Sequence, residues 1–378
     1  MKARLGDYIR EYSVRNKINE DIPVYSVTNS QGFCKDYFGK EVASKDKSTY
    51  KIVPKGCFAY NPSRINVGSV DWQRNEERVI VSPLYNVFSV SSDLDNQYLY
   101  YFLKSDIALC LIKNIATGSV RDNLKLSMLY EFPINLPNIE RQKEIVSTLD
   151  KLQSIITHLR IQLEKLDLLV KARFVEMFGD PIINSKGWKT AFIGDNCFVT
   201  KLAGFEYTQY IHYEEIGDVV MVKAQNVKKG KLNRKELSYI SKEVSDLLPR
   251  SKLAPNDIVM TYVGANIGDV AIIDDIYKYH LAPNVAKIRP DSKIYNSIYF
   301  MYMLMFMTEY IVSNSADTAK AALGMERIRK LKVFVPPIEL QTQFADFVKQ
   351  VDQSKSILQQ ELDKAQTLFD SLMQEYFG

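Results

Sequence analysis

A long segment of this chain occurs twice, and this internal repeat constrains the fold more than any other feature of the sequence. Residues 137–179 align without a gap on residues 336–378, with identical residues at both ends and through the middle. A gapless match of that length indicates an internal duplication. We therefore expect two related halves, and a function that is two-fold in some sense.

The repeated segment has the pattern of a long helix with one apolar stripe. Apolar residues step by alternating fours and threes, which favours a coiled-coil partner over a surface position. The stripe holds Ile145, Leu149, Leu152, Ile156, Leu159, Leu163, Leu166, Val170 and Met177 in the first copy, and Phe344, Val348, Val351, Leu358, Leu362, Ala365, Phe369, Leu372 and Tyr376 in the second. Arg173 and Lys355 are the polar interruptions, and one such residue can fix the register of a coiled coil. The alternative is that each helix packs on its own mixed domain.

The segments outside the repeat have the pattern of mixed domains. Short β-rich runs lie between turn residues at 23–27, 57–60 and 85–90, and matching runs lie at 219–222, 257–262 and 285–288. An aromatic helix follows in each half, and its helical spacing favours a core position over a base-stacking surface. The predicted fold class is α+β. Two similar mixed domains, at 1–136 and 180–335, are separated by long helices at 137–179 and 336–378, which form an antiparallel coiled coil with pseudo-two-fold symmetry.

Composition limits the function classes without selecting one. The chain has 378 residues, 46% of them hydrophobic and 25% charged, which is typical of a globular protein with room for two cores. A net charge of +4 permits an anionic partner without demanding one. There is no apolar run long enough to span a bilayer and no apolar signal core at the start, so we expect a cytoplasmic protein that does not bind membranes.

The sequence shows no motif of an enzyme active site. It has no phosphate-binding loop, no Gly-x-Ser-x-Gly elbow and no His-Glu-x-x-His helix. Four cysteines and three histidines are scattered without metal-ligand spacing, so simple thiols are expected rather than disulfides or a metal site. We predict that the chain binds rather than catalyses, and that it has no cofactor.

Polar and basic loops in both halves have the composition of a nucleic-acid interface. Phosphate contacts need Lys, Arg, Asn or Ser on turns, and base readout needs Arg, Asn or Gln that can reach a groove. Each loop taken alone is better explained as a solvated surface, but their joint occurrence in both halves favours nucleic acid. The candidate DNA-binding residues are Lys45, Lys47, Arg64, Asn66, Arg121, Asn123 and Lys125 in the first half, and Gln225, Asn226, Lys228, Lys229, Lys231, Arg250 and Lys252 in the second.

Several landmarks together resemble one protein family. The motif Leu-Pro-x-x-Glu-x-Gln at 136–142 opens the first long helix, a Thr-Gly-Ser segment at 117–119 leads to Asn123, and a Pro-Asn-Asp turn stands at 255–257. With the order of variable domain, helix, variable domain and helix, the whole chain resembles the DNA-specificity subunit of type I restriction-modification systems. The second copy departs from the pattern, with Leu340 in place of Arg141 and Ala322 in place of Asn123. The last departure argues against an equal DNA contact by Asn123 and Ala322.

The resemblance implies two target-recognition domains, each reading one half of a bipartite site in double-stranded DNA through the major groove, with the paired helices as a spacer. It also implies a non-catalytic subunit. The implied partners are two methyltransferase subunits, and two restriction subunits that complete an ATP-dependent nuclease. One competing interpretation is a coiled-coil adaptor whose two mixed domains bind proteins. Another is a stand-alone enzyme.

Overall fold

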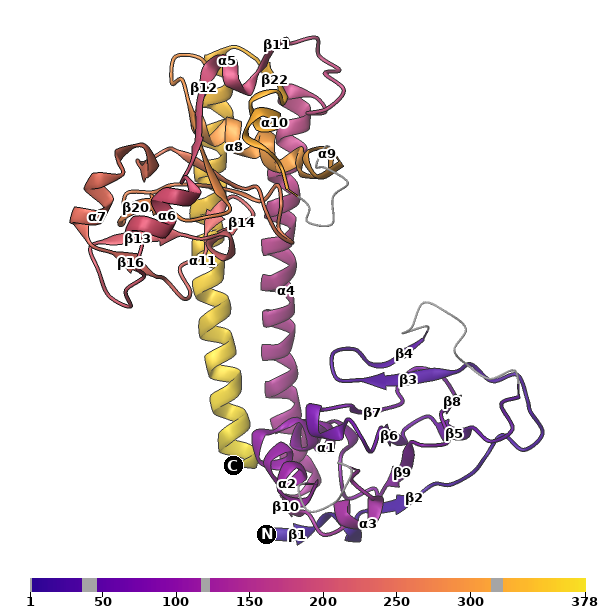
Figure 1. Cartoon of the computed structure of the whole chain (residues 1–378). Helices are drawn as coiled ribbons and strands as arrows, with labels where there is room; N and C mark the ends of the chain where they lie inside the picture. The colour runs from indigo at the N-terminus through magenta and orange to yellow at the C-terminus, as the bar shows by residue number, and fades with distance from the viewer. Residues whose placement is uncertain (1, 36–45, 117–122, 314–321) are drawn as a thin grey trace. The chain divides into compact units, whose positions relative to one another are not determined.

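The computed structural model describes residues 2–35, 46–116, 123–313 and 322–378 (Figure 1). The chain forms two compact units: unit 1 contains Met1–Ile161 and Gln359–Gly378, and unit 2 contains Gln162–Leu358. Each unit combines helices and sheets around its own apolar core. Among the described residues, no helix combines the length and the apolar character that a membrane crossing requires.

Unit 1 is built on an antiparallel sheet with the strand order β2–β9–β6–β7. These strands are β2 (Ile9–Glu11), β6 (Phe58–Tyr60), β7 (Val70–Trp72) and β9 (Asn86–Val90). Smaller ladders join β1 (Lys2–Arg4) to β10 (Pro133–Asn135), β3 (Tyr25–Thr28) to β4 (Gly32–Lys35), and β5 (Lys51–Pro54) to β8 (Arg78–Val81). The shorter helices are α1 (Asn96–Lys104), α2 (Asp106–Ala116) and α3 (Leu126–Leu129), with 3-10 turns η1 (Leu5–Asp7) and η2 (Ile65–Val67).

Unit 2 contains a matching sheet with the order β12–β21–β18–β19 and a second sheet with the order β16–β13–β20–β17. The strands are β12 (Cys197–Lys201), β13 (Val219–Val222), β16 (Tyr239–Ile240), β17 (Lys252–Leu253), β18 (Ile258–Thr261), β19 (Val270–Ile272), β20 (Lys278–Leu281) and β21 (Val285–Pro290). Smaller ladders join β11 (Lys189–Phe192) to β22 (Lys332–Val335) and β14 (Val227–Lys228) to β15 (Lys231–Leu232). The shorter helices are α5 (Ile193–Asn196), α6 (Gly204–Tyr210), α7 (Lys242–Leu247), α8 (Ser297–Phe306), α9 (Thr308–Ser313) and α10 (Met325–Arg329), with 3-10 turns η3 (Ala224–Asn226) and η4 (Pro249–Ser251).

The main sheets of the two units have the same topology. β2, β9, β6 and β7 correspond in order to β12, β21, β18 and β19. The register of the central hairpin is also shared, because Tyr60 pairs with Val70 and Met260 pairs with Val270. The predicted α+β fold with two related mixed domains is confirmed.

The aromatic helices α1 and α8 follow the main sheet in each unit, and their rings belong to the cores as predicted. Tyr98 and Phe102 of α1, like Tyr299 and Phe300 of α8, are 2% exposed or less. The rings are therefore committed to packing and cannot serve as base-stacking platforms.

The repeated segments form the two long helices α4 (Ile139–Phe178) and α11 (Ile338–Phe377), each of 40 residues. They run antiparallel in both units. In unit 1, Arg160 Nη2 donates to Gln366 Oε1 at 3.2 Å, and in unit 2, Lys355 Nζ donates to Asp167 Oδ1 at 2.5 Å. The predicted apolar stripes are buried or half-buried along both helices, and most positions between them are exposed. The predicted helix pair is confirmed.

The first turns of each long helix also pack on the domain that precedes it in sequence. Ile145 of α4 lies in the core of unit 1 together with Phe377, and Phe344 of α11 lies in the core of unit 2 together with Phe174. Pairing with the other helix and packing on a mixed domain therefore both occur.

A buried glutamine joins the start of each long helix to the aromatic helix of the same unit. The side chain of Gln142 accepts from the backbone N–H of Asp95, the N-cap of α1, at 2.8 Å. The side chain of Gln341 accepts from Asn296, the N-cap of α8, at 2.9 Å. Their Nε2 groups donate to main-chain carbonyls at matching places, which are Asp93 and Pro137 in unit 1 and Ile294 and Pro336 in unit 2. The repeated Pro-x-Ile-Glu-x-Gln motif thus has a structural role at its glutamine.

Candidate nucleic-acid interface

The loop that follows β6 in unit 1 is closed by its own hydrogen bonds and carries two of the candidate residues. Asn61 Oδ1 accepts from the backbone N–H of Ser63 at 3.1 Å, and the N–H of Arg64 donates to the Asn61 carbonyl at 3.0 Å. Ile65 is 1% exposed and anchors the next turn in the core. The Arg64 side chain is exposed, and its guanidinium has no hydrogen-bond or ion-pair partner among the described residues.

A second segment, residues 123–125, lies directly against this loop. The N–H of Leu124 donates to the Pro62 carbonyl at 3.2 Å, and the Leu124 carbonyl accepts from the Tyr60 hydroxyl at 3.0 Å. Burial raises the pKa of Tyr60, so its phenol stays protonated and continues to donate. Ser63 Oγ donates to Asn123 Oδ1 at 2.6 Å, which completes the contact between the two segments.

The structure therefore brings together four of the predicted residues of the first half. Arg64, Asn123 and Lys125 are exposed on neighbouring segments, and Asn66 is half-exposed in η2 beside them. Lys47 belongs to another loop, where its N–H donates to Asn19 Oδ1 at 2.8 Å and its Nζ lies 3.6 Å from Asp21 Oδ1. Lys45 and Arg121 lie outside the described residues.

In unit 2, the predicted lysines form a tight hairpin. Lys229 (φ +44°) and Gly230 (φ +85°) connect β14 to β15, and two positive φ angles are the requirement of a type I′ turn. Glycine also fits the packing, because a Cβ at position 230 would lie 3.1 Å from Met301 Sδ. Lys228 and Lys229 are exposed, while Lys231 Nζ lies 2.9 Å from Asp352 Oδ1 on α11. The hairpin thus presents two lysines to solvent and uses the third within unit 2.

Asn226 and Gln225 precede the hairpin and differ in their surroundings. Asn226 is 2% exposed, and its amide accepts from the N–H of Lys223 and donates to the carbonyls of Asn233 and Lys235. It holds its own loop together. Gln225 is exposed, with its Nε2 at 3.5 Å from Glu236 Oε2.

Arg250 is exposed and Lys252 is half-exposed, and each of these cations is paired with a carboxylate. Arg250 Nη2 lies 3.1 Å from both carboxylate oxygens of Glu206, and Lys252 Nζ pairs with Asp246. The main-chain carbonyls of Arg250 and Lys252 accept from the buried Nζ of Lys287, which fixes this bend.

Unit 2 repeats the backbone contact seen between the two segments of unit 1. The N–H of Leu323 donates to the Tyr262 carbonyl at 2.8 Å, as Leu124 does to Pro62. The side chains on this frame differ, because Val263 and Ala322 stand where unit 1 has Ser63 and Asn123. Lys201, whose Nζ lies 5.4 Å from the centre of the Tyr262 ring, is an exposed cation beside this frame. Neither Lys201 nor Tyr262 could be identified from the sequence, because only the common frame shows that Tyr262 matches Pro62.

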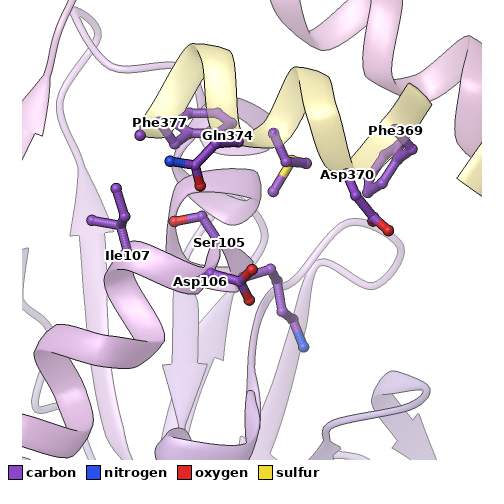
Figure 2. Close-up of a pocket in the computed structure, with 10 residues that line it drawn as sticks. Ser105, Asp106, Ile107, Phe369, Asp370, Gln374 and Phe377 are labelled. Carbon is purple, nitrogen blue, oxygen red and sulfur yellow. The ribbon is translucent and has the colours of Figure 1, made fainter. Parts of the chain in front are cut away.

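A cavity of about 100 Å³ lies in unit 1 between the α1–α2 corner and the last turns of α11. Figure 2 shows Asp106 and Asp370 among its polar residues, and Phe369 and Phe377 among its apolar ones. Pockets for drug-sized ligands measure about 300–1,000 Å³. This cavity therefore lacks the room for a nucleotide-sized cofactor.

Comparison with known proteins gives one family over both halves of the chain. The model of the type I restriction modification DNA specificity domain matches residues 8–165 and 185–367. Among curated relatives, the specificity subunit of the Escherichia coli type I restriction enzyme EcoBI is 22% identical over 89% of this chain and 76% of its own length. A putative type I specificity subunit, MjaX, of Methanocaldococcus jannaschii is 21% identical over 88% of this chain and 80% of its own length.

Solved structures show the same fold along the whole chain. A chain from a study of complex assembly and conformational transition of the type I restriction-modification system matches with a TM-score of 0.60 at 15% identity, over 100% of this chain and 97% of that chain. The S subunit of a type I restriction-modification system from M. genitalium matches with a TM-score of 0.59 at 16% identity, over 100% of this chain and 96% of that chain.

Proposed function

The chain belongs to the type I restriction modification DNA specificity family, and we propose that it selects the DNA site for a modification complex by reading a bipartite sequence, one half with each unit. Each unit has its own main sheet and its own copy of the repeated motif, which supports this division of the site.

The observation that carries the proposal is a pair of equivalent backbone contacts, one in each unit, whose neighbouring side chains differ between the units. The hydrogen bonds from Leu124 to Pro62 and from Leu323 to Tyr262 define this frame. Binding specificity commonly resides in loops that vary on a rigid scaffold. The frame has this character, since unit 1 presents the polar Ser63 and Asn123 where unit 2 presents the apolar Val263 and Ala322.

Exposed lysines of the candidate interface in both units are proposed to supply the sequence-independent part of DNA binding. Phosphate contacts position a protein on the duplex, and base contacts specify the sequence. Lys125 in unit 1 and Lys228 and Lys229 in unit 2 are exposed and suited to phosphate. Arg250 and Lys252 would have to exchange a carboxylate partner for phosphate, so we expect smaller contributions from them.

We propose that the chain performs no chemistry and that its helix pair docks methyltransferase subunits. Leu168 and Val175 of α4 are 65% and 44% exposed in unit 2, and they lie seven residues apart on one helix face. Leu169 beside them is 47% exposed. Exposed apolar residues at this spacing favour packing of a partner helix. Methyl transfer, and DNA cleavage when restriction subunits join, would then belong to the partners.

Mapping of methylated bases tests the proposal. DNA is sequenced from a host that carries a methyltransferase partner, with and without this chain. A split motif that appears only with the chain is the expected result. Equal binding of specific and scrambled DNA by the complex would instead favour the protein-binding adaptor, and methyl transfer by the purified chain alone would favour an enzyme.

A single variant tests the division of the site between the units. Arg64→Ala is expected to weaken recognition in one half-site only, by about 1–3 kcal/mol for a lost base contact. Arg4→Ala is the matched control, because Arg4 is an exposed arginine of unit 1 that pairs with Glu131. Loss of recognition in both half-sites after Arg64→Ala would contradict the scheme.

A further inference from the structure

We propose that Asn123 reads an adenine in the half-site of unit 1, and that Ser63 is the positioning residue that orients its amide. The inference rests on the proposed function and deepens it, because it names the base that one unit recognises. It starts from a hydrogen bond between two exposed side chains, each of which lies in or next to a hydrogen-bonded segment of the backbone.

Ser63 is held in place by its own loop. Its N–H donates to Asn61 Oδ1 at 3.1 Å, within the turn that Asn61 and Arg64 close. From this turn, Ser63 Oγ donates to Asn123 Oδ1 at 2.6 Å. The backbone next to Asn123 is fixed as well, since Leu124 is hydrogen-bonded at both its N–H and its carbonyl. The amide of Asn123 is therefore presented in one orientation.

The oriented amide has the donor and acceptor pattern that matches adenine. A carbonyl oxygen has two lone pairs, so Asn123 Oδ1 can accept a second hydrogen bond, and both Nδ2 protons remain available. In the major groove, adenine offers the N6 donor beside the N7 acceptor, whereas guanine offers two acceptors. An asparagine side chain can therefore bind adenine through both groups at once. Orienting the amide before binding reduces the entropy that is lost on binding.

The matching place in unit 2 cannot make this contact. Val263 and Ala322 are joined there by a backbone bridge, and neither side chain has a hydrogen-bonding group. Reading of adenine by a serine-held amide is therefore confined to unit 1. The two half-sites are read by different chemistry at structurally equivalent positions.

The test uses the full chain assembled with its methyltransferase subunits and duplexes that carry its bipartite site. Each adenine in turn is replaced by 7-deazaadenine, which lacks the N7 acceptor and keeps base pairing. We expect one adenine, in one half-site, at which the replacement weakens binding on the order of tenfold. With Asn123→Ala, the same replacement is expected to cause no further loss.

Two further variants separate a positioning role from a merely structural one. Asn123→Asp keeps the size of the side chain and removes the N–H donors, so it is expected to lose the same adenine dependence. Ser63→Ala is expected to reduce the discrimination at that adenine alone, with the salt dependence of binding unchanged. Ser63→Thr, which keeps the hydroxyl, is expected to restore the discrimination.

Three results would overturn the inference. The first is that no adenine replacement has an effect that Asn123→Ala abolishes, and the second is that such adenines occur in both half-sites. The third is that the effect abolished by Asn123→Ala is that of replacing a guanine by 7-deazaguanine. Failure of Ser63→Thr to restore discrimination would remove the positioning role of Ser63. If the wild-type complex preferred no DNA sequence, the proposed function would fail together with the inference. If it read a bipartite site without dependence on N7 of an adenine, the inference alone would fail.

Discussion

Gln142 and Gln341 are completely buried, and each uses both ends of its amide to hold two helix starts together. Glu140 and Glu339, from the same motif, are exposed in the first turns of α4 and α11. There their charge interacts favourably with the helix dipole. The repeated motif thus combines a residue that fixes tertiary structure with one that acts within its own helix.

Gln142→Ala is expected to lower the free energy of unfolding by about 1–3 kcal/mol, because it leaves buried main-chain groups without partners. The backbone N–H of Asp95 loses its acceptor, so its hydrogen exchange should become faster. Glu140→Ala is the matched control and is expected to change the stability by about 0.5 kcal/mol or less. Unchanged exchange at Asp95 in Gln142→Ala would show that the contact does not restrain α1.

Lys287 gives a pH dependence to the stability of unit 2. Its side chain is 2% exposed, and burial lowers its pKa to about 8. In the unfolded chain its pKa returns to about 10.4. Between these two pKa values, the unfolded chain binds more protons at Lys287 than the folded chain does. The contribution of Lys287 to the free energy of unfolding therefore rises with pH, and this contribution is lost as the pH falls through 8.

We therefore expect Lys287→Met to reduce the rise in stability between about pH 8 and pH 10. Chemical denaturation of both proteins at several pH values measures the difference, and the comparison cancels the titration of groups that they share. An equal slope for the two proteins would mean that Lys287 titrates near its ordinary pKa in the folded chain.

Sequence composition identified amides and cations for the candidate interface, but not the partners of each. Asn123 and Asn226 were equivalent candidates, yet Asn123 is exposed and Asn226 is buried in its own loop. The difference comes from carbonyls several residues away that accept from Asn226, and such contacts depend on the folded loop. The roles of these residues in DNA binding stay predictions.

Regular elements were predicted closely, because their hydrophobic period is local. The run expected at 219–222 is β13, and the expected aromatic helices are α1 and α8. The exception is the end of α4, where Arg173 was expected on the stripe and Phe174 is the buried residue, at 1% exposure. A helix has about 3.6 residues per turn, so a stripe of period 3.5 drifts around it. Over a helix of this length, the drift moves the buried face by one residue.

Lys355 is the polar residue of the α11 stripe, and its side chain is only 17% exposed. Its repeat counterpart in α4, Ile156, is completely buried. We expect Lys355→Ile to raise the free energy of unfolding by about 1 kcal/mol, since an apolar residue of similar volume often improves on a partly buried ion pair. In this variant Asp167 loses its ion-pair partner, but Asp167 is exposed to water, so this loss costs little free energy.

Thermal unfolding of Lys355→Ile and of Asp167→Ala measures this effect. Asp167→Ala is the control that removes the ion pair while the lysine stays, and it is expected to lower the stability. A large loss in Lys355→Ile would show that the ion pair, rather than apolar packing, stabilises this part of the helix pair.

At the scale of the whole molecule, the internal repeat predicted two related units, and the structure confirms them. The repeat could not show how far the units differ outside the main sheet. Unit 2 has a second four-stranded sheet that includes β13 and β20, whereas unit 1 forms two separate two-stranded ladders, β3–β4 and β5–β8, in the corresponding segments. These segments have little common sequence, so alignment of the two halves could not reveal the additional sheet.

The long helices are proposed to set the gap between the two half-sites, and their length can be changed by whole heptads. Seven residues add about 10.5 Å of helix, which corresponds to about three base pairs of duplex at roughly 3.4 Å each. Insertion of one heptad after Leu163 and another after its repeat counterpart Leu362 is expected to lengthen the gap in the methylated motif by about that amount. A heptad in α4 alone should impair activity, because the antiparallel stripes would no longer match along their length. An unchanged gap in the double insertion, measured by sequencing of methylated bases, would contradict the role of the helix pair as a spacer.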